Sequence, residues 1–346
     1  MASPRRRGWP RAERSGSARP LIILGVTLAA SSKKVIYAAL AGNALIAITK
    51  FVAAGITGSS AMLSEGIHSV VDTGNQALLL HGLARAKRPP SDDFPFGHGK
   101  EVYFWSFVVA ILIFAVGAGV SAYEGVKHIL NPVPMEDPLV NYIVLGLALI
   151  FEGTSWSVAR KEFAKWKGDL GYAEAVHRGK DPTLFVVLFE DSAAMLGLGV
   201  AFLGILLSQI TGNPLYDGLG ALLIGIILGG TAAWLAYETK GLLIGEAAGR
   251  HVVQGIRRIV SSAKAVEKVN EVLTVHMGPE FILVNLSLDF HDDLEVGEVE
   301  RAIADLDRAI KAAYPFVKRV FIEAESAVAF ARQQAKAAEE SSQRPG

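Results

Sequence analysis

The chain has 346 residues, of which 51% are hydrophobic and 20% charged, and its formal net charge at pH 7 is zero. This apolar content exceeds that of an ordinary soluble protein and indicates a membrane protein, while the zero net charge excludes a global field that would attract nucleic acid. The chain has no cysteine. Disulfides and thiolate metal sites are therefore excluded, and any metal must be bound by His, Asp, Glu or neutral oxygen ligands.

Residues 1–32 are predicted to form a basic flexible arm, in which Glu13 is the one acidic residue among many arginines. Three alternatives are a signal peptide, a mitochondrial presequence rich in Arg and Ser, and an over-extended gene start. The apolar stretch PLIILGVTLAASS within this arm is too short to cross a bilayer.

Six apolar runs of about 20 residues follow, each long enough to cross a bilayer. They are continuous rather than alternating, which favours helices over the strands of a membrane barrel. The predicted fold is a membrane α-helical domain of six transmembrane helices over residues 33–240. The runs are 35–56, 59–83, 103–126, 139–159, 183–208 and 217–238.

Lysine and arginine are distributed asymmetrically around these runs. They concentrate in residues 5–34, 85–100 and 160–180, whereas the three short connections on the other side contain only Lys127. Because cytoplasmic loops carry the excess of Lys and Arg, both termini are predicted to be cytoplasmic, or to lie in the matrix of a mitochondrion. The expected location is a bacterial inner membrane or an organelle membrane.

After residue 240 the pattern is that of a small α+β domain. Hydrophobic residues follow helical and strand-like spacings in the order α-β-β-α-β. This order predicts a cytoplasmic ferredoxin-like or metallochaperone-like domain over 241–328. A disordered tail is predicted for 329–346. The expected elements are a helix at 249–265, strands at 269–278 and 281–290, a helix at 296–313 and a strand at 317–325.

The second run contains three ionisable side chains within two turns. Glu65, His68 and Asp72 are three and four residues apart, so a helix places them on one face. An ionised group at the bilayer centre costs roughly 2.5–3.5 kcal/mol, which makes such residues functional candidates. An imidazole and a carboxylate one turn apart can both reach one small cation. Asn75 and Gln76 continue the polar character deeper into the span.

Further acidic residues lie in the fourth and fifth runs. Glu190 and Asp191 are adjacent and point about 100° apart on a helix, so one can line a site while the other faces a neighbouring helix or crevice. Glu152 lies in the fourth run. These groups can pair with each other or with Lys50 for packing, but carboxylates on three helices outnumber one lysine. A divalent cation would neutralise the excess, and protons can replace it when it leaves, which is the chemistry of a cation/proton exchanger.

Histidine and carboxylate ligands without sulfur suit Zn²⁺, with Fe²⁺, Co²⁺ and Mn²⁺ as alternatives, and fit Mg²⁺ and Ca²⁺ less well. A channel or metal-gated sensor is a second reading of the same residues. The clustering of charges near one depth, rather than in rings along a pore, favours a transporter. An enzyme is not expected, because the chain has no HExxH motif and no recognisable nucleophile–base pair.

Three motifs together carry a family resemblance: SSAMLSEGIHSVVD in the second run, FPFGHGKEVYFWSF leading into the third, and LLIGEAA after the sixth. With the six spans and the small C-terminal domain, they make residues 35–326 similar to the cation diffusion facilitator family, nearest to the branch of the animal zinc transporter nine proteins. The resemblance implies alternating-access exchange of a divalent metal, usually Zn²⁺, for protons by a homodimer in the lipid bilayer.

The resemblance also implies a metal site built from two residues in span two and two in span five, each pair four apart. Three positions match as His68, Asp72 and Asp191, whereas the fourth falls on Val187, which cannot bind a metal. A nearby carboxylate or a water molecule must then complete the site. The predicted ligands are His68, Asp72, Asp191 and Glu190, and the predicted accessory ligands or proton-path residues are Glu65, Glu152 and Asn75.

A peripheral metal site is predicted in the loop before span three, where His98 follows Asp92 and Asp93; the alternative is a loop ordered by its glycine turns. In the small domain, family resemblance implies positions for regulatory zinc. They are Asn285, Glu323, Glu325 and His276. Because this set is poor in histidine, the domain is interpreted chiefly as a dimerisation module.

Overall fold

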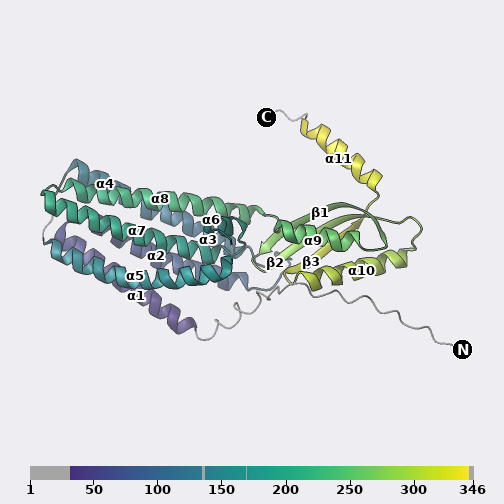
Figure 1. Cartoon of the computed structure of the whole chain (residues 1–346), viewed down its shortest axis with the longest axis horizontal. Coiled ribbons are helices and arrows are strands. Elements are labelled where there is room, and N and C mark those ends of the chain that lie inside the picture. Colours follow the sequence, from purple (N-terminus) through teal and green to yellow (C-terminus); the bar gives the residue numbers. More distant parts are fainter. Residues whose placement is uncertain (1–31, 135–136, 169, 343–346) are drawn as a thin grey trace. The chain divides into compact units, whose positions relative to one another are not determined.

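The computed structural model describes residues 32–134, 137–168 and 170–342 (Figure 1). The chain forms two compact units, residues 1–42 and residues 43–346. Of the first unit, only the beginning of helix α1 is among the described residues. The predicted basic arm, with its alternatives of a signal peptide or a presequence, lies outside the described residues up to residue 31.

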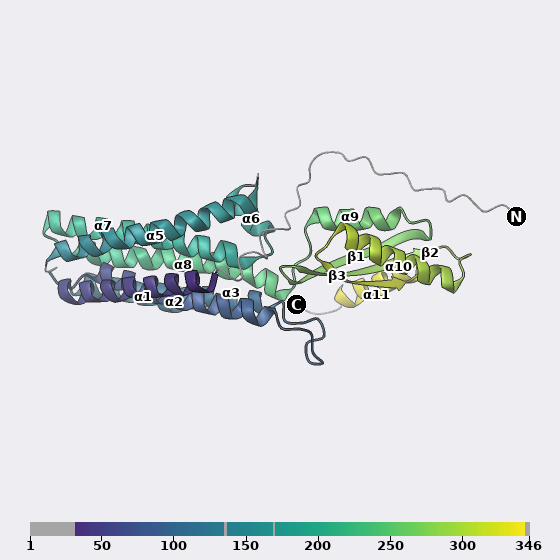
Figure 2. The ribbon, with the colours of Figure 1, turned by 90° about the horizontal axis from the view of Figure 1, so that it is seen from below.

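A helical bundle forms the first part of the described chain. The longest helices, among them α2, α5, α7 and α8, run side by side in two perpendicular views (Figures 1 and 2). The bounds are α1 (Ser32–Thr57), α2 (Ser60–Ala86), α3 (Glu101–Leu112), η1 (Ile113–Ala118), α4 (Gly119–Leu130), α5 (Pro138–Lys167), α6 (Tyr172–Arg178), α7 (Pro182–Thr211) and α8 (Leu215–Ile244).

Four of these helical segments are long and apolar enough to cross a membrane: Glu101–Leu130, Pro138–Lys165, Pro182–Thr211 and Leu215–Ile244. The first combines α3, the π-helical segment η1 and α4 into one 30-residue helix. In α1, the apolar stretch Asn43–Thr57 is shorter. Helix α2 has 27 residues but carries the ionisable residues that the sequence identified.

Small residues let the bundle helices approach at the level of the backbone. A Cβ atom on Gly125 of α4 would collide with the backbone amide of Leu222 in α8. Conversely, a Cβ atom on Gly225 would lie 2.8 Å from the amide nitrogen of Ala122. Such close packing of small residues is the usual means by which helices associate in lipid.

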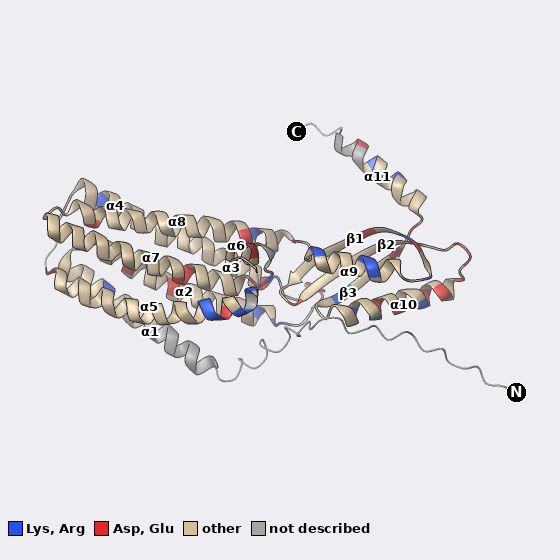
Figure 3. Ribbon diagram, in the orientation of Figure 1, with Lys and Arg blue, Asp and Glu red and all other residues tan. Residues whose placement is uncertain are grey.

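The outer surface of the bundle is apolar, as expected for helices in contact with lipid acyl chains. Large hydrophobic side chains of different helices are exposed, for example Leu45, Ile143, Phe151, Leu203 and Ile226. Charged residues are sparse along the long helices (Figure 3), and Glu65 of α2 and Glu190 of α7 are buried. The interior rather than the exterior of the bundle therefore carries the charge.

The second part of the described chain is a small α+β domain in the expected order α-β-β-α-β. Its elements are α9 (Arg250–Ser261), β1 (Val266–Gly278), β2 (Phe281–Phe290), α10 (Val296–Ala313) and β3 (Val317–Ala324). The sheet has the order β1-β2-β3, with β2 antiparallel to β1 and parallel to β3. Glu295 and Glu298 form a capping box at the start of α10.

Helices α9 and α10 pack on one face of this sheet. Alternating residues of β2, including Val284 and Leu286, form a core with Ile256 of α9 and Ile310 of α10. A cross-strand row of Leu273, Asn285 and Phe321 runs across the sheet. Both of its hydrophobic members are half exposed.

Two segments differ from the sequence-based expectation. A helix, α11 (Ala327–Ser342), occupies most of the segment 329–346 for which a disordered tail was predicted. Its alanines, glutamines and glutamates are strong helix formers, and this local preference outweighs the polar composition that favours disorder. Helix α5 also extends to Lys167, beyond the predicted end at residue 159, and the short helix α6 was not predicted.

Candidate metal centre

Helix α2 holds the principal side chains of the candidate site, and its start is fixed from two sides. Gly58 follows α1 with a positive φ of 70°. Ser59 then caps α2 by accepting a hydrogen bond from the Met62 amide at 3.1 Å. Asp217, near the start of α8, accepts hydrogen bonds from the hydroxyl groups of Ser59 and Ser60. These contacts hold α2 in place against α8.

His68 and Asp72 lie one turn apart on α2 and approach each other closely. His68 Nδ1 is 3.3 Å from Asp72 Oδ1, although the two groups are not aligned as a hydrogen bond. His68 is only 1% exposed, and neither ring nitrogen has a hydrogen-bond partner among the described residues. Because buried polar atoms in native proteins almost always have a partner, this pair has spare capacity to bind a ligand.

The adjacent residues Glu190 and Asp191 of α7 diverge into two environments. Asp191 Oδ2 accepts a hydrogen bond from Ser155 of α5 at 3.0 Å. Glu190 is buried and accepts a hydrogen bond from Asn75 of α2 at 2.6 Å. The two acidic side chains therefore connect α7 to different helices.

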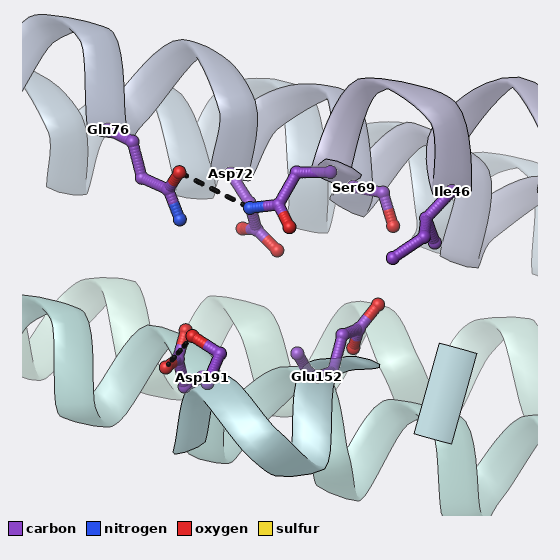
Figure 4. Close-up of a pocket in the computed structure, with 9 residues that line it drawn as sticks. Ile46, Ser69, Asp72, Gln76, Glu152 and Asp191 are labelled. Carbon is purple, nitrogen blue, oxygen red and sulfur yellow. Dashed lines mark hydrogen bonds between the residues drawn. The ribbon is translucent and has the colours of Figure 1, made fainter. Parts of the chain in front are cut away.

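A small cavity lies between α1, α2, α5 and α7, with a volume of about 20 Å³, the space of roughly one water molecule or one small ion. Asp72, Glu152 and Asp191 line it from three different helices. The amide groups of Asn43 and Gln76 also line it and are hydrogen-bonded to each other (Figure 4). His68 and Glu190 lie outside this lining.

The remaining predicted residues of the bundle interior, Glu65 and Glu152, are both paired with Lys50 of α1. Lys50 Nζ lies 3.0 Å from Glu65 Oε2 and 2.7 Å from Glu152 Oε1. Val187 packs against the hydrophobic core. The alternative considered from sequence, pairing with Lys50, therefore holds for these two glutamates, while Asp72 and Asp191 have no ion pair with a lysine or arginine among the described residues.

Three polar residues of the cavity were missed by the reading of the sequence: Asn43, Ser69 and Ser155. Helical spacing offers a signal for the last two, since Ser69 precedes Asp72 by three residues and Ser155 follows Glu152 by three. No comparable signal marks Asn43, because no charged residue lies within four positions of it along α1.

Within the described parts of the chain, no three His, Asp or Glu side chains converge as a ready-made metal cluster. In the loop before α3, Asp92 and Asp93 are exposed, and the ring of His98 packs against Phe94 at 4.5 Å between centroids. Side chains would therefore have to move before a cation could be bound, both by the acidic residues inside the bundle and by Asp92, Asp93 and His98 in the loop.

Of the four predicted positions in the small domain, His276 and Glu325 make local contacts, whereas Glu323 is exposed. Ser287 donates a hydrogen bond to Glu325 Oε2 at 3.0 Å. His276 is buried next to the Gly278 carbonyl, and burial lowers the pKa of its imidazole, so the ring is neutral at pH 7. Asn285 lies in the cross-strand row with Phe321.

The sequence of this chain is similar to a known protein family and to several known membrane transport proteins. Residues 36–244 match the family model of the cation efflux transmembrane domain. The chain is 38% identical over 260 residues to the proton-coupled zinc antiporter SLC30A9, mitochondrial, of Xenopus laevis, a match that covers 74% of this chain and 46% of that protein. The human protein of the same name is 36% identical over the same length.

Two further relatives come from a plant and a bacterium. Metal tolerance protein C4 of Arabidopsis thaliana is 30% identical over 267 residues, covering 77% of this chain and 58% of that protein. The cation-efflux pump FieF of Escherichia coli is 28% identical over 280 residues, covering 80% and 87%. The chain spans about half the length of the first of these curated relatives.

Proposed function

Because the chain belongs to the cation diffusion facilitator family of membrane transport proteins, we propose that it exports divalent transition-metal cations from the cytoplasm in exchange for protons by alternating access. The proposed principal substrate is Zn²⁺. One observation carries the proposal for this chain: Asp72 and Asp191, on two different helices, line one small cavity inside an apolar bundle without a lysine or arginine partner in the described residues.

The proposed ligands are Asp72, Asp191, His68 and Glu190, with water or Glu152 completing the set. Rotation of the His68 ring would bring it to a cation held by Asp72, which already lines the cavity, since the two groups are 3.3 Å apart. Asp191 would approach from α7. Three carboxylates and one imidazole form a donor set that suits Zn²⁺.

Protons are the proposed counter-substrate because the site contains more acidic groups than the metal charge requires. Asp72, Glu152 and Asp191 line one small cavity, and three neighbouring carboxyl groups cannot all stay ionised without a cation, so Asp72 carries a proton in this proposal when the metal is absent. Metal binding to Asp72 would displace that proton. Release of the metal on the other side of the membrane would allow a proton to bind again, which couples the two movements.

The alternative substrates are Fe²⁺, Co²⁺ and Mn²⁺, transported by the same mechanism. The observation that favours them is the hydrophobic Val187, which packs in the core where the family resemblance expects a fourth ligand. A site that depends more on carboxylates than on imidazole binds these harder cations relatively better. A metal-gated channel or sensor is the other alternative for the same residues.

For the membrane topology we propose six spans, with α1 and α2 added to the four long apolar segments, and both termini in the cytoplasm or mitochondrial matrix. The basic residues of the connections α2–α3 and α5–α7 support this orientation. The family members named mitochondrial support an organelle location, and the bacterial relative supports an inner membrane.

For the remaining parts we propose a transmembrane domain over 33–240 and a cytoplasmic domain of ferredoxin-like type over 241–328 that forms a homodimer. The parallel pairing of β2 with β3 and the two helices on one face support this fold. The half-exposed side chains of Leu273 and Phe321 support a contact with a second copy. The loop residues His98, Asp92 and Asp93 stay a proposed peripheral metal site.

The function is tested with the full chain reconstituted in proteoliposomes under an imposed pH gradient, with uptake of Zn²⁺, Fe²⁺, Co²⁺ and Mn²⁺ measured in parallel. We expect saturable uptake, highest for Zn²⁺, that a proton ionophore abolishes and that moves protons in the opposite direction. Uptake that ignores the pH gradient would indicate a channel. Absence of uptake of all four metals would overturn the proposal.

A further inference from the structure

Lys50 is a fully buried lysine whose ammonium group is surrounded by partners from other helices. Its relative exposure is 0%. Nζ donates hydrogen bonds to Glu65 Oε2 at 3.0 Å, to Ser69 Oγ at 2.9 Å and to Glu152 Oε1 at 2.7 Å. An ammonium group has three hydrogens, so its donor capacity is fully used.

This arrangement is a built cation site that the protein fills with its own side chain. Two carboxylates and a hydroxyl oxygen surround one positive charge, in an interior where an unpaired charge is strongly disfavoured. Lys50 is on α1, Glu65 and Ser69 are on α2, and Glu152 is on α5. The ammonium group therefore joins three helices at one point.

Glu152 is the member of this group that also belongs to the cavity. One oxygen, Oε1, binds Lys50, whereas Oε2 is buried and has no hydrogen-bond partner among the described residues. The same side chain lines the cavity with Asp72 and Asp191. Glu152 points from α5 across the cavity, towards the side on which Ser69 and Ile46 lie (Figure 4). It is thus the carboxylate that both a cation in the cavity and the Lys50 ammonium can reach.

We infer that Lys50 is a resident cation that competes with the transported divalent cation for Glu152. Without metal, Lys50 holds Glu152 and balances part of the negative charge. When the metal binds, Glu152 is shared with it or transferred to it, and the ammonium is retained by Glu65 and Ser69. Lys50 acts as a positioning residue, and this inference rests on the proposed function.

Competition from Lys50 lowers the affinity of the site for the divalent cation. A ligand that must displace a bound partner loses affinity by the free energy of that displacement. For a transporter, such weakening favours release on the far side of the membrane, because the ammonium returns to Glu152 as the metal leaves. Lys50 would therefore lower the affinity for metal while raising the rate of turnover.

A purely structural role for Lys50 predicts the opposite change in affinity. If the lysine only holds α1, α2 and α5 together, its removal loosens the cavity and weakens metal binding. If it competes, removal of its charge strengthens binding. The direction of the change in Kd therefore separates the two roles.

The test measures Zn²⁺ binding to the purified full-length protein and Zn²⁺ transport by the same samples in proteoliposomes. The variant Lys50→Met keeps the length of the side chain and removes the charge. We expect its Kd and its KM for Zn²⁺ to fall about tenfold, and kcat to fall as well. Lys127→Met is the matched control, because Lys127 is exposed and pairs only with Glu124 in the described structure. We expect this control to be unchanged.

A second variant keeps the inference falsifiable if Lys50→Met folds poorly. Glu65→Gln weakens the second anchor of the ammonium, so Lys50 binds Glu152 more tightly and the Kd for Zn²⁺ should rise about threefold. If Glu65 were itself a metal ligand, this loss would persist in the double variant with Lys50→Met. We expect it to vanish there, as a double-mutant cycle detects.

The two levels of the proposal fail in different ways. Wild-type protein that neither binds nor transports Zn²⁺, Fe²⁺, Co²⁺ or Mn²⁺ overturns the proposed function and this inference with it. Wild-type protein that binds Zn²⁺, with unchanged or weaker binding in Lys50→Met, overturns the inference alone. Unchanged or tighter binding of Zn²⁺ by Glu65→Gln would also overturn the inference alone.

Discussion

Two buried acidic regions of the bundle differ in how completely their carboxylates are satisfied. At the start of α8, Asp217 is 1% exposed and accepts hydrogen bonds from the Ser59 hydroxyl at 2.6 Å and from the Ser60 amide and hydroxyl at 2.6 and 2.9 Å. Between α2 and α7, Asp72 leaves Oδ1 without a hydrogen-bond partner among the described residues and faces Asp191 across a cavity.

This difference separates structural carboxylates from candidate functional ones. Asp217 caps the N-terminus of α2 from a neighbouring helix, so its charge is neutralised by the amide and hydroxyl dipoles around it. Asp72 and Asp191 have fewer donors than they can accept, which leaves room for a cation. Burial of an acidic residue in a membrane protein is therefore informative only together with its list of partners.

The largest expected effect is loss of transport on removing the carboxylate of Asp72 or that of Asp191, two of the three that line the cavity. We expect Asp72→Ala and Asp191→Ala to reduce Zn²⁺ uptake into inverted vesicles by at least about 100-fold, because a charged ligand of the bound cation is lost. Thermal unfolding should change little, since neither residue supports a helix end. Full transport by both variants would remove the cavity as the metal site.

Asp217→Ala should reverse this pattern and lower stability rather than metal binding. Loss of the cap and of several buried hydrogen bonds is expected to reduce the free energy of unfolding by about 2 kcal/mol. Thermal unfolding in detergent measures this change, and Zn²⁺ affinity of the folded protein should stay within about twofold. Asp217→Asn keeps one carbonyl acceptor and should lose less. Unaltered stability with abolished Zn²⁺ binding would assign Asp217 to the transport site instead.

Glu190 belongs to neither extreme, because it is buried and accepts a hydrogen bond from Asn75 but lies outside the lining of the cavity. We expect Glu190→Gln to transport Zn²⁺ at roughly a tenth of the wild-type rate. The rate should also depend less steeply on pH, since one proton-exchanging carboxyl group is removed. Transport measured between pH 6 and pH 8 tests this. If neither the Zn²⁺ affinity nor the pH profile changes, Glu190 is a packing residue.

A substitution next to Glu65 tests whether transport depends on the position of the Glu65 carboxylate. A Cβ atom on Gly197 of α7 would collide with Glu65 Oε1, whereas a Cβ atom on Gly199 meets open space. Gly197→Ala should displace the Glu65 carboxylate and lower transport roughly fivefold, while Gly199→Ala is the matched control without effect. Equal activity of the two alanine variants would mean that the position of Glu65 is unimportant.

The smallest expected effect concerns the single hydrogen bond that Asp191 receives from Ser155. Ser155→Ala should change the Kd for Zn²⁺ by about two- to fivefold, the usual effect of one partly exposed hydrogen bond. Ser157→Ala is the control, since the Ser157 hydroxyl bonds only the Gly153 carbonyl in the described structure. A loss of binding as large as that in Asp191→Ala would give Ser155 a direct role.

The secondary structure of the small domain was predictable because local patterns decide it. Strand β2 and helix α10 begin and end where the period-2 and period-3.6 patterns do, at 281–290 and 296–313. In α11 helix propensity outweighs the polar composition on which the predicted disorder rests, and the structure has a helix there. Helix propensity acts over a few residues, so it can be read without the fold.

By itself, the sequence determined that the chain is membrane-embedded, which face of α2 is polar, and that Glu190 and Asp191 must diverge, since these follow from apolar length and helical period. Only the tertiary structure decided that Asp191 rather than Glu190 lines the cavity and that Lys50 binds Glu152, a residue 102 positions away. The physical reason is that a helical pattern specifies angles around one axis, whereas the partner of each buried charge depends on how separate helices are rotated and shifted against one another.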